Sequence, residues 1–367
     1  MVRKQDQIRG CLLGQAAGDA LGFCVEELTL AQIQEKYGPE GIRGYDMVNG
    51  YAEVSSHTQL AMFAANGLLF GATRGAVRGV MAPYVKYVEM ACRDWAKTQR
   101  YGGRRPDERV YSWLYALEPL RVRRCPDPAV LDALNRPGTG SMDEPVNRSQ
   151  GCGGLTRAAP LGLFLDPAEV PRQEIALLGA ESAALTQGHP LGFLPGAYLT
   201  YLINRILYDR PDSFRAVLKS TCAAMERQFG DRYPQTAAIR EQLFRAEFLA
   251  STPAPPAECM ERLSPTQAPG VLAAACYVCL KFPGDFDHGL VAAVNHSGAS
   301  AAVGAVAGAL LGAMVGTEGI PEFYLEPLEL RGILEELADD LFQGCPMSRS
   351  ARLFDDQWDQ KYIQCTY

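Results

Sequence analysis

The sequence lacks long apolar runs, an excess of positive charge and any regular cysteine spacing. No uninterrupted apolar run reaches the roughly 18 residues that span a bilayer, so we expect no membrane partner. Acidic residues outnumber basic ones by 42 to 35, and the net charge is −7. This balance argues against general nucleic-acid binding, which depends on cations that face phosphates.

The cysteines and the N-terminus both indicate a protein of the cytoplasm. The eleven cysteines are odd in number and lie scattered in apolar segments, which is typical of buried thiols in a reducing compartment. Cys276 and Cys279 form a lone CxxC that cannot supply four zinc ligands, so we predict a structural role for them. Residues 1–22 do not resemble a signal peptide, because Gln15 and Asp19 interrupt the apolar positions.

Helical periodicity dominates what is present. Ile8, Cys11, Leu12 and Ala16 fall on one face of a predicted helix. The stretches TQLAMFAANGLLFGA, GFLPGAYLTYLINRILY, PGVLAAACYVCLKF and ASAAVGAVAGALLGAMVG also read as helices, whereas strand signals are scarce. The last of them repeats Gly304, Gly308 and Gly312 on one face, which predicts a buried helix with a closely packed neighbour. We therefore predict an all-α fold.

The chain shows no internal repeat and no long flexible linker. Two stretches, from about Thr98 to Gly154 and from Ser251 to Pro265, are rich in loop-forming residues. The basic segment from Arg100 to Cys125 reads as a solvated face, with a local anion patch as the alternative. We predict one compact domain over residues 1–367, with a helical or tail extension over 317–367.

Five short segments carry residues suited to a ligand site. Glu26 and Glu27 follow the first predicted helix, where a carboxylate can act as acid, base or ribose ligand. A glycine-rich turn at 151–154 leads into a helix and can cradle an anion. His189 precedes a proline, and the turns at 55–58 and 295–298 open onto apolar helices. Helix capping explains both of these turns equally well.

Together and in this order, the five segments resemble the ADP-ribosylglycohydrolase family. The segments are IRGCLLGQAAGDALGFCVEE, SSHTQLAMFAANGLL, NRSQGCGGLTRAAPLGL, LTQGHPLGFLPGAYLTYLI and AVNHSGASAAVGAVAGALLGAMVG, which span residues 8–316. The family includes arginine-specific ADP-ribosyl hydrolases and the dinitrogenase reductase activating glycohydrolase. The resemblance implies a compact all-α fold with a cleft for ADP-ribose and two magnesium ions.

The chain departs from the family at its metal ligands. The four aspartates of the family correspond to Ser56, His57, Ala299 and Ala301, and its last hydroxyl ligand corresponds to Ala302. Magnesium prefers an octahedral set of oxygen ligands, commonly including carboxylates. We therefore expect a divergent member with no metal site and no cofactor.

The resemblance assigns a set of residues to the cleft. Glu26 and His57 are the candidate catalytic residues, and Asp19 is expected to be structural. The imidazole of His57 has no counterpart in the family, so it could instead contact a phosphate when protonated or fill space, and we favour these two roles. The candidate ligand-binding residues are Ser55, Ser56, Thr58, Gly151, Cys152, Gly153, Gly154, His189, Asn295, His296, Ser297, Gly298 and Ser300.

Three interpretations of this cleft remain open. In the first, it binds ADP-ribose or a related nucleotide without magnesium-dependent hydrolysis, or binds a protein partner as an antagonist of an ADP-ribosyltransferase. In the second, it hydrolyses an N- or O-ribosyl bond of an ADP-ribosylated substrate without metal, with Glu26 and His57 as acid and base. In the third, side chains fill the cleft and the protein is purely structural.

Overall fold

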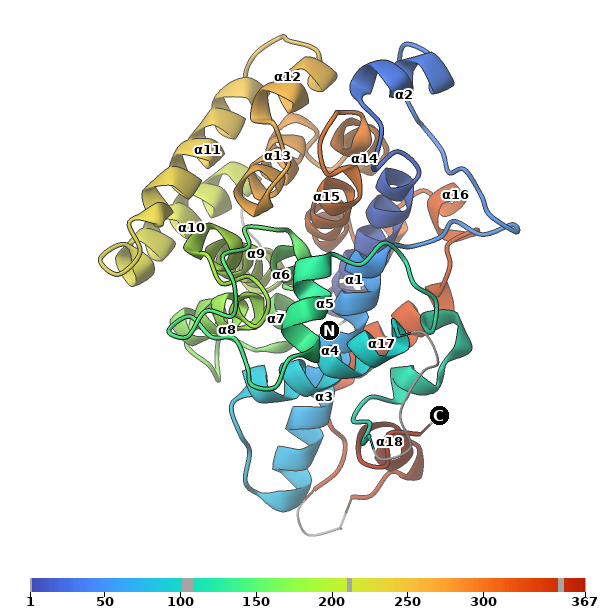
Figure 1. The fold of residues 1–367 in the computed structure, drawn as a ribbon, viewed down its shortest axis with the longest axis vertical. Helices are drawn as coiled ribbons and strands as arrows, with labels where there is room; N and C mark the ends of the chain where they lie inside the picture. Colours follow the sequence, from blue (N-terminus) through green and yellow to red (C-terminus); the bar gives the residue numbers. More distant parts are fainter. Residues whose placement is uncertain (1, 101–107, 210–212, 349–352, 367) are drawn as a thin grey trace.

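The computed structural model describes residues 2–100, 108–209, 213–348 and 353–366, and these ranges form a helical protein (Figure 1). The β structure in these ranges is limited to two isolated bridges, Val48–Tyr51 and Ala52–Leu328. The prediction of an all-α fold is confirmed. The α-helices are α1 (Val2–Phe23), α2 (Leu30–Tyr37), α3 (Ser56–Arg78), α4 (Tyr84–Thr98), α5 (Pro128–Asn135), α6 (Gly153–Thr156), α7 (Ala159–Phe164), α8 (Arg172–Ala184), α9 (Pro190–Asp209), α10 (Phe214–Phe229), α11 (Gln235–Ala250), α12 (Pro256–Leu263), α13 (Ala268–Lys281), α14 (Phe286–Val294), α15 (Ser300–Val315), α16 (Glu322–Leu325), α17 (Arg331–Gln343) and α18 (Asp356–Tyr362).

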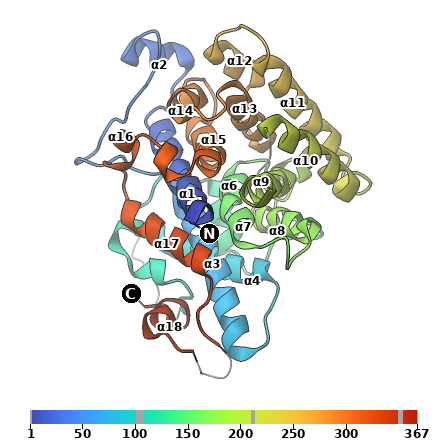
Figure 2. The ribbon, with the colours of Figure 1, turned by 180° about the vertical axis from the view of Figure 1, so that it is seen from behind.

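Helices α1 and α15 form the antiparallel pair at the centre of the molecule (Figures 1 and 2). Their glycines face one another across the contact. A Cβ atom on Gly308 would lie 1.9 Å from the carbonyl oxygen of Gly14, and one on Gly304 would lie 2.1 Å from that of Gly18. The close neighbour predicted for the glycine face is therefore α1. This packing brings the end of α1 beside the start of α15.

Helix α3 is the one described helix that is long and apolar enough to cross a membrane by length and composition. Within the fold, 72% of its apolar window is buried. Its residues join those of α1, α9, α13 and α15 in one buried cluster that extends to Trp358 and Tyr362 of α18. Helix α3 is thus a core helix of this fold, and its N-terminus points toward the end of α1.

The two stretches predicted as rich in loops contain more helix than expected. Helix α12 lies inside the second, and α5 lies inside the first together with the 3-10 turns η1 (Trp113–Ala116) and η2 (Glu118–Leu120). Both α5 and α12 begin at a proline. Proline suits the first helical position because the amide lost there has no intrahelical partner. The prolines of these stretches therefore favour a prediction of loops, although two of them are the first residues of helices.

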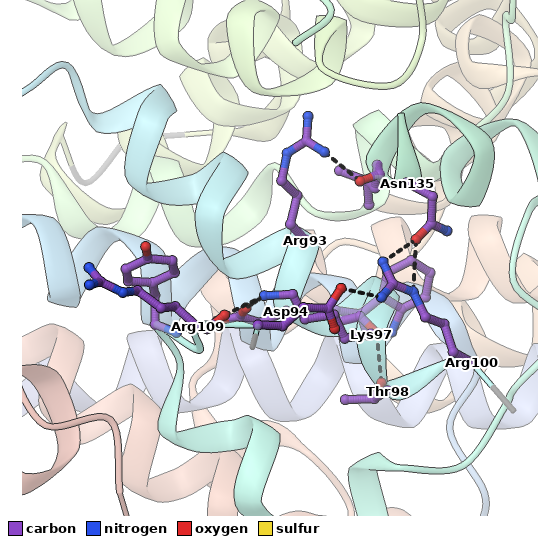
Figure 3. A network of polar contacts seen from close by, with 11 residues as sticks. Arg93, Asp94, Lys97, Thr98, Arg100, Arg109 and Asn135 are labelled. Atoms are coloured by element: carbon purple, nitrogen blue, oxygen red, sulfur yellow. Dashed lines mark hydrogen bonds and ion pairs between the residues drawn. The ribbon is translucent and has the colours of Figure 1, made fainter. Parts of the chain in front are cut away.

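The described part of the basic segment is mixed, because Arg109, Arg121 and Arg123 are exposed, as predicted for a solvated face, whereas other arginines here are tied into the structure. Arg93 of α4 donates to the carbonyls of Leu134 and Arg136 at the end of α5, and Arg100 donates to the Asn135 side chain at 2.7 Å (Figure 3). Arg124 pairs with two glutamates and is 15% exposed. Arg93 thus donates to backbone carbonyls at the end of α5, where a cation is favourable, and Arg124 forms ion pairs with carboxylates. Residues 101–107 of this segment lie outside the described ranges.

The cysteines are free thiols, and most are buried as predicted. Cys276 and Cys279 lie inside α13 with no exposed surface. Cys125 is the exposed exception, in the loop before α5.

Candidate functional site

The N-terminus of α3 is fixed by a buried carboxylate from α1. Asp19 is fully buried, and its two oxygens accept hydrogen bonds from the amide and hydroxyl of Ser55 and from the amide and hydroxyl of Thr58, at 2.6–3.1 Å. Ser55 is also the N-cap of α3. The hydroxyl protons of Ser55 and Thr58 are thus donated to Asp19. Asp19 holds the turn in place, which agrees with the structural role expected for it.

His57 lies between α3 and α6. Its Nδ1 atom is 2.9 Å from the hydroxyl oxygen of Thr156, and its side chain is only partly exposed. Burial lowers the pKa of His57, against the opposing charges of Asp19 and Asp127. Ser56 beside it is 3% exposed and donates to the carbonyl of Cys125 at 3.4 Å. The turn therefore presents a neutral imidazole at neutral pH.

The glycine-rich turn is packed tightly from behind. A Cβ atom on Gly153 would lie 2.7 Å from Val130, and one on Gly154 would lie 2.7 Å from Ala183. Gly151 is partly exposed, whereas Cys152 is 8% exposed. Burial raises the pKa of the Cys152 thiol, so this thiol is a poor nucleophile. Glycine is required here because neighbouring side chains occupy the space.

Arg157 lies behind this turn and is fully buried. Its guanidinium donates to the carbonyl of Gly153 at 3.2 Å and to the hydroxyl of Thr186 at 2.9 Å. No carboxylate of the described chain lies within ion-pair distance of it, and burial lowers its pKa. A buried cation without a counter-ion is costly. Arg157 places a positive charge behind the turn, and the Asp127 carboxylate compensates it only from beyond ion-pair distance.

Asp127 is a site residue that the sequence reasoning missed. It is the N-cap of α5, and its Oδ1 atom accepts from the amide of Ala129 at 2.8 Å. Its Oδ2 atom faces Gly151, 2.8 Å from where a Cβ atom of that residue would lie. Asp127-Pro128 is a helix-start signal that could have marked the residue.

Glu26 lies beside the start of α15. Its Oε2 atom accepts a hydrogen bond from the amide of Ala301 at 2.6 Å. The N-cap residue Ala299 has only a methyl side chain, which cannot accept such a bond. Burial raises the pKa of Glu26 to about 7, the Ala301 amide opposes this rise, and the nearby charges of Asp19 and Glu27 add to it. A carboxyl group with this pKa exchanges protons near neutral pH.

The turn before α15 is committed to internal hydrogen bonds. Asn295 exchanges two bonds with the backbone of Ile42, and the ring of His296 bonds the backbone at both nitrogens. Burial lowers the pKa of His296 to about 4. Ser300 is buried and donates to the carbonyl of His296. This turn supports the site from behind.

Two predicted residues lie at the edge of the site. The exposed Ser297 accepts from the amide of Leu30 through its hydroxyl. His189 is partly exposed, and its Nδ1 atom accepts from the amide of Leu191 at the start of α9.

Charge interactions connect some of the candidate residues, since Glu26 and Asp127 act on Cys152, and Asp19 and Asp127 act on His57. Glu26 contacts the start of α15, His57 contacts α6 and Asp127 faces the glycine turn. Glu26, His57, Gly151, His189 and Gly298 are each partly exposed, so the region reaches solvent.

The residues present do not fit the magnesium pair that the resemblance implies. Ser55 and Ser56 already donate their hydroxyls, and Ala299, Ala301 and Ala302 carry only methyl groups. Among the residues with described positions, no three histidine, cysteine, aspartate or glutamate side chains form a group that could hold a metal ion. Magnesium requires several oxygen ligands at once. This donor set does not supply them.

Comparisons with known proteins agree with the fold and the motif order. A family model described as ADP-ribosylglycohydrolase matches residues 1–351. The chain is similar to a solved structure titled "ADP-ribosylglycohydrolase-related protein complex", with 26% identity and a TM-score of 0.60. That match covers 94% of this chain and 99% of the other. No curated protein matches. Because the family model covers nearly the whole length, the chain belongs to the ADP-ribosylglycohydrolase family.

Proposed function

We propose that the chain binds ADP-ribose, or an ADP-ribosyl group, between the glycine turn and the starts of α3 and α15, without a magnesium pair. The observation that carries this proposal is the buried cation of Arg157 behind the Gly151–Gly154 turn. A diphosphate in front of the turn gains from that charge, and glycine amides at a helix start are suited to anions. Asp127 is the described carboxylate whose charge acts on Arg157, and it does not form an ion pair with it.

The same region lacks what hydrolysis by two metals would need. His57 and the alanines of α15 stand where the family carries carboxylates, and they supply one imidazole and no oxygen ligand. Binding should therefore be insensitive to magnesium. An antagonist that holds an ADP-ribosyltransferase or its modified target in the cytoplasm is a specific form of this proposal.

Calorimetry with ADP-ribose tests the binding proposal. We expect saturable binding with the same affinity in magnesium and in EDTA. Gly151→Val should weaken it at least about tenfold, because the new side chain occupies the approach to the turn. Gly44→Val is the matched control, since nothing lies within 4 Å of a Cβ atom there. Binding that requires magnesium would contradict the proposal.

A second candidate function, metal-free hydrolysis, is favoured by one observation. Glu26 has a pKa raised to about 7 in the same region as the Asp127 carboxylate, whose Oδ2 atom faces Gly151. Two carboxyl groups in different environments can divide acid and base roles in glycosidic cleavage. In this scheme Glu26 protonates the leaving atom, and Asp127 or His57 removes a proton from the attacking water.

Release of ADP-ribose from an ADP-ribosylated arginine substrate tests this second candidate. Turnover should persist in chelator and fall at least about 100-fold in Glu26→Gln, which is typical of a lost general acid. Gln retains an acceptor for the Ala301 amide, so the fold around α15 is preserved. Turnover that Glu26→Gln leaves unchanged would exclude Glu26 from the chemistry.

A further inference from the structure

A second cavity lies at the end of the molecule where α14 lies between α2 and α12 (Figures 1 and 2). Its volume is about 410 Å³, within the range of small-molecule pockets. One wall comes from α2 and the following loop, one from the start of α12, and the floor from α14. The lining residues are Gln34, Pro39, Glu40, Arg43, Pro255, Pro256, Ala257, Phe282, Asp287, His288, Val291, Ala292 and Asn295.

The turn from Asn295 to Ser297 adjoins both this cavity and the candidate site. Asn295 lines the cavity, but its side-chain amide is bonded to the backbone of Ile42 and Val291. Ser297 is held by Leu30 on one side and by the Glu261 carboxylate on the other. These bonds join α2, α12 and the α14–α15 turn. The cavity therefore has fixed walls.

Two aromatic side chains of the lining are nearly parallel. The rings of Phe282 and His288 have centroids 6.5 Å apart and an interplanar angle of 15°. The Nδ1 atom of His288 lies 2.8 Å from the Asp285 carboxylate, which fixes the orientation of the ring. Two parallel rings beside apolar proline and alanine surfaces favour a planar aromatic ligand, because such a ligand can stack on the rings. Stacking does not select strongly among different aromatic rings.

The charges of the lining disfavour a phosphate. Arg43 lies 2.7 Å from the Glu40 carboxylate, so its charge is already compensated. Asp287 accepts from the hydroxyl of Tyr324 through Oδ1, and its other oxygen has no described partner. The lining contains two carboxylates, Glu40 and Asp287, and one arginine, Arg43. A neutral or cationic ligand suits this balance, and the carboxylate can accept from a ring or ribose donor.

We propose that this cavity is a binding site for a planar nitrogen heterocycle without negative charge, such as a nucleobase or nucleoside, stacked on Phe282 and His288 and hydrogen-bonded to Asp287. The proposal does not depend on the function of the candidate site.

Calorimetric titration with adenosine tests the proposal, with AMP as its phosphorylated counterpart. Adenosine should bind saturably and AMP more weakly. Phe282→Ala should weaken adenosine binding at least about fivefold, which corresponds to the loss of one base–aromatic stack. Ala257→Trp should abolish binding by filling the cavity. Thermal melting of each variant checks that the fold is retained.

The Gly151→Val variant distinguishes the two sites, because adenosine is itself part of ADP-ribose. Adenosine binding should survive Gly151→Val and disappear in Ala257→Trp. The reverse pattern would assign adenosine to the candidate site and overturn the cavity proposal. So would the absence of saturable binding, AMP binding as tight as adenosine binding, or an unchanged affinity in Phe282→Ala.

Discussion

Ala299 gives the start of α15 no side-chain cap, and Glu26 accepts a backbone amide there in its place. Ala299 is the N-cap residue, and the amide of Ala301 donates to Glu26 instead. Glu26 thus has a structural role whether or not it performs chemistry. The two roles are separable, because a neutral amide can accept the hydrogen bond but cannot act as an acid.

Substitutions at Glu26 should separate capping from charge. At pH 5 we expect Glu26→Ala to be less stable than Glu26→Gln by about 1 kcal/mol, the usual cost of a lost helix cap. Urea unfolding of the two variants measures the difference. Equal stability would show that the bond to the Ala301 amide does not stabilise α15.

The raised pKa of Glu26 should make stability fall as pH rises. The folded state holds the proton to about pH 7, whereas the unfolded chain releases it near 4.5. This contribution is therefore complete below pH 4.5 and is lost by pH 7. The lowered pKa of His296 acts in the opposite direction, with stability gained from about pH 4 to 6.5.

Comparison of wild type with Glu26→Gln isolates this effect, because both proteins contain His296. The stability of Glu26→Gln relative to wild type should rise between pH 4.5 and 7, by at most about 3 kcal/mol. Denaturant unfolding at four pH values gives the difference. A difference that does not change with pH would mean that Glu26 is not buried as described.

The sequence predicted the segments of the candidate site better than the roles within them. Motif order identified the turns that meet at Glu26, His57 and Gly151. It did not show that Asp19 accepts the hydroxyls of Ser55 and Thr58, since these residues are far apart along the chain. Asp127 was missed because a lone aspartate before a proline has an ordinary capping explanation.

At the scale of whole helices, apolar periodicity predicted the helices of the core. Amino-acid composition gave the wrong prediction, a loop, for some of the helices outside it. Helices α1, α3, α9, α13 and α15 were visible because their apolar or glycine positions recur at helical spacing. Helix α12 was not, because prolines at its start resemble a loop. The pairing of α1 with α15 required the structure, since a glycine face shows that a neighbour is close but not which helix it is.

The contact between α1 and α15 should tolerate no added methyl group. Gly308→Ala would place Cβ against the backbone of Gly14, which cannot move without shifting α1. We expect a loss of about 1–3 kcal/mol or more in the free energy of unfolding, typical of overpacking. Gly332→Ala in α17 is the matched control, because nothing lies within 4 Å there. It should leave stability unchanged or slightly higher, since alanine is the better helix former.

A destabilised Gly332→Ala, or a neutral Gly308→Ala, would contradict this packing. Chemical denaturation of both variants under the same conditions decides between these outcomes.

For the molecule as a whole, the resemblance implies that acids are absent from two segments far apart in the sequence, the starts of α3 and α15. The starts of α3 and α15 flank α1, and each carries two of the positions where the family has aspartates. Carboxylates about 4 Å apart repel by roughly 4 kcal/mol at an effective dielectric constant near 20. Once the metals are absent, removal of the acids from both helices relieves this repulsion. This repulsion supports the proposal of a cleft that works without metal.

Restoring the four acids should make stability depend on magnesium. The test is a single variant that carries four substitutions, Ser56→Asp, His57→Asp, Ala299→Asp and Ala301→Asp. In EDTA we expect this variant to have a lower Tm than wild type, because its carboxylates repel one another. Millimolar magnesium should raise that Tm by linking α3 to α15, since ligands of the folded state stabilise it. Asparagine at the same four positions is the control of equal shape, and it should not respond. Wild-type Tm should be the same in both conditions, and a rise with magnesium would mean that the present residues hold the ion after all.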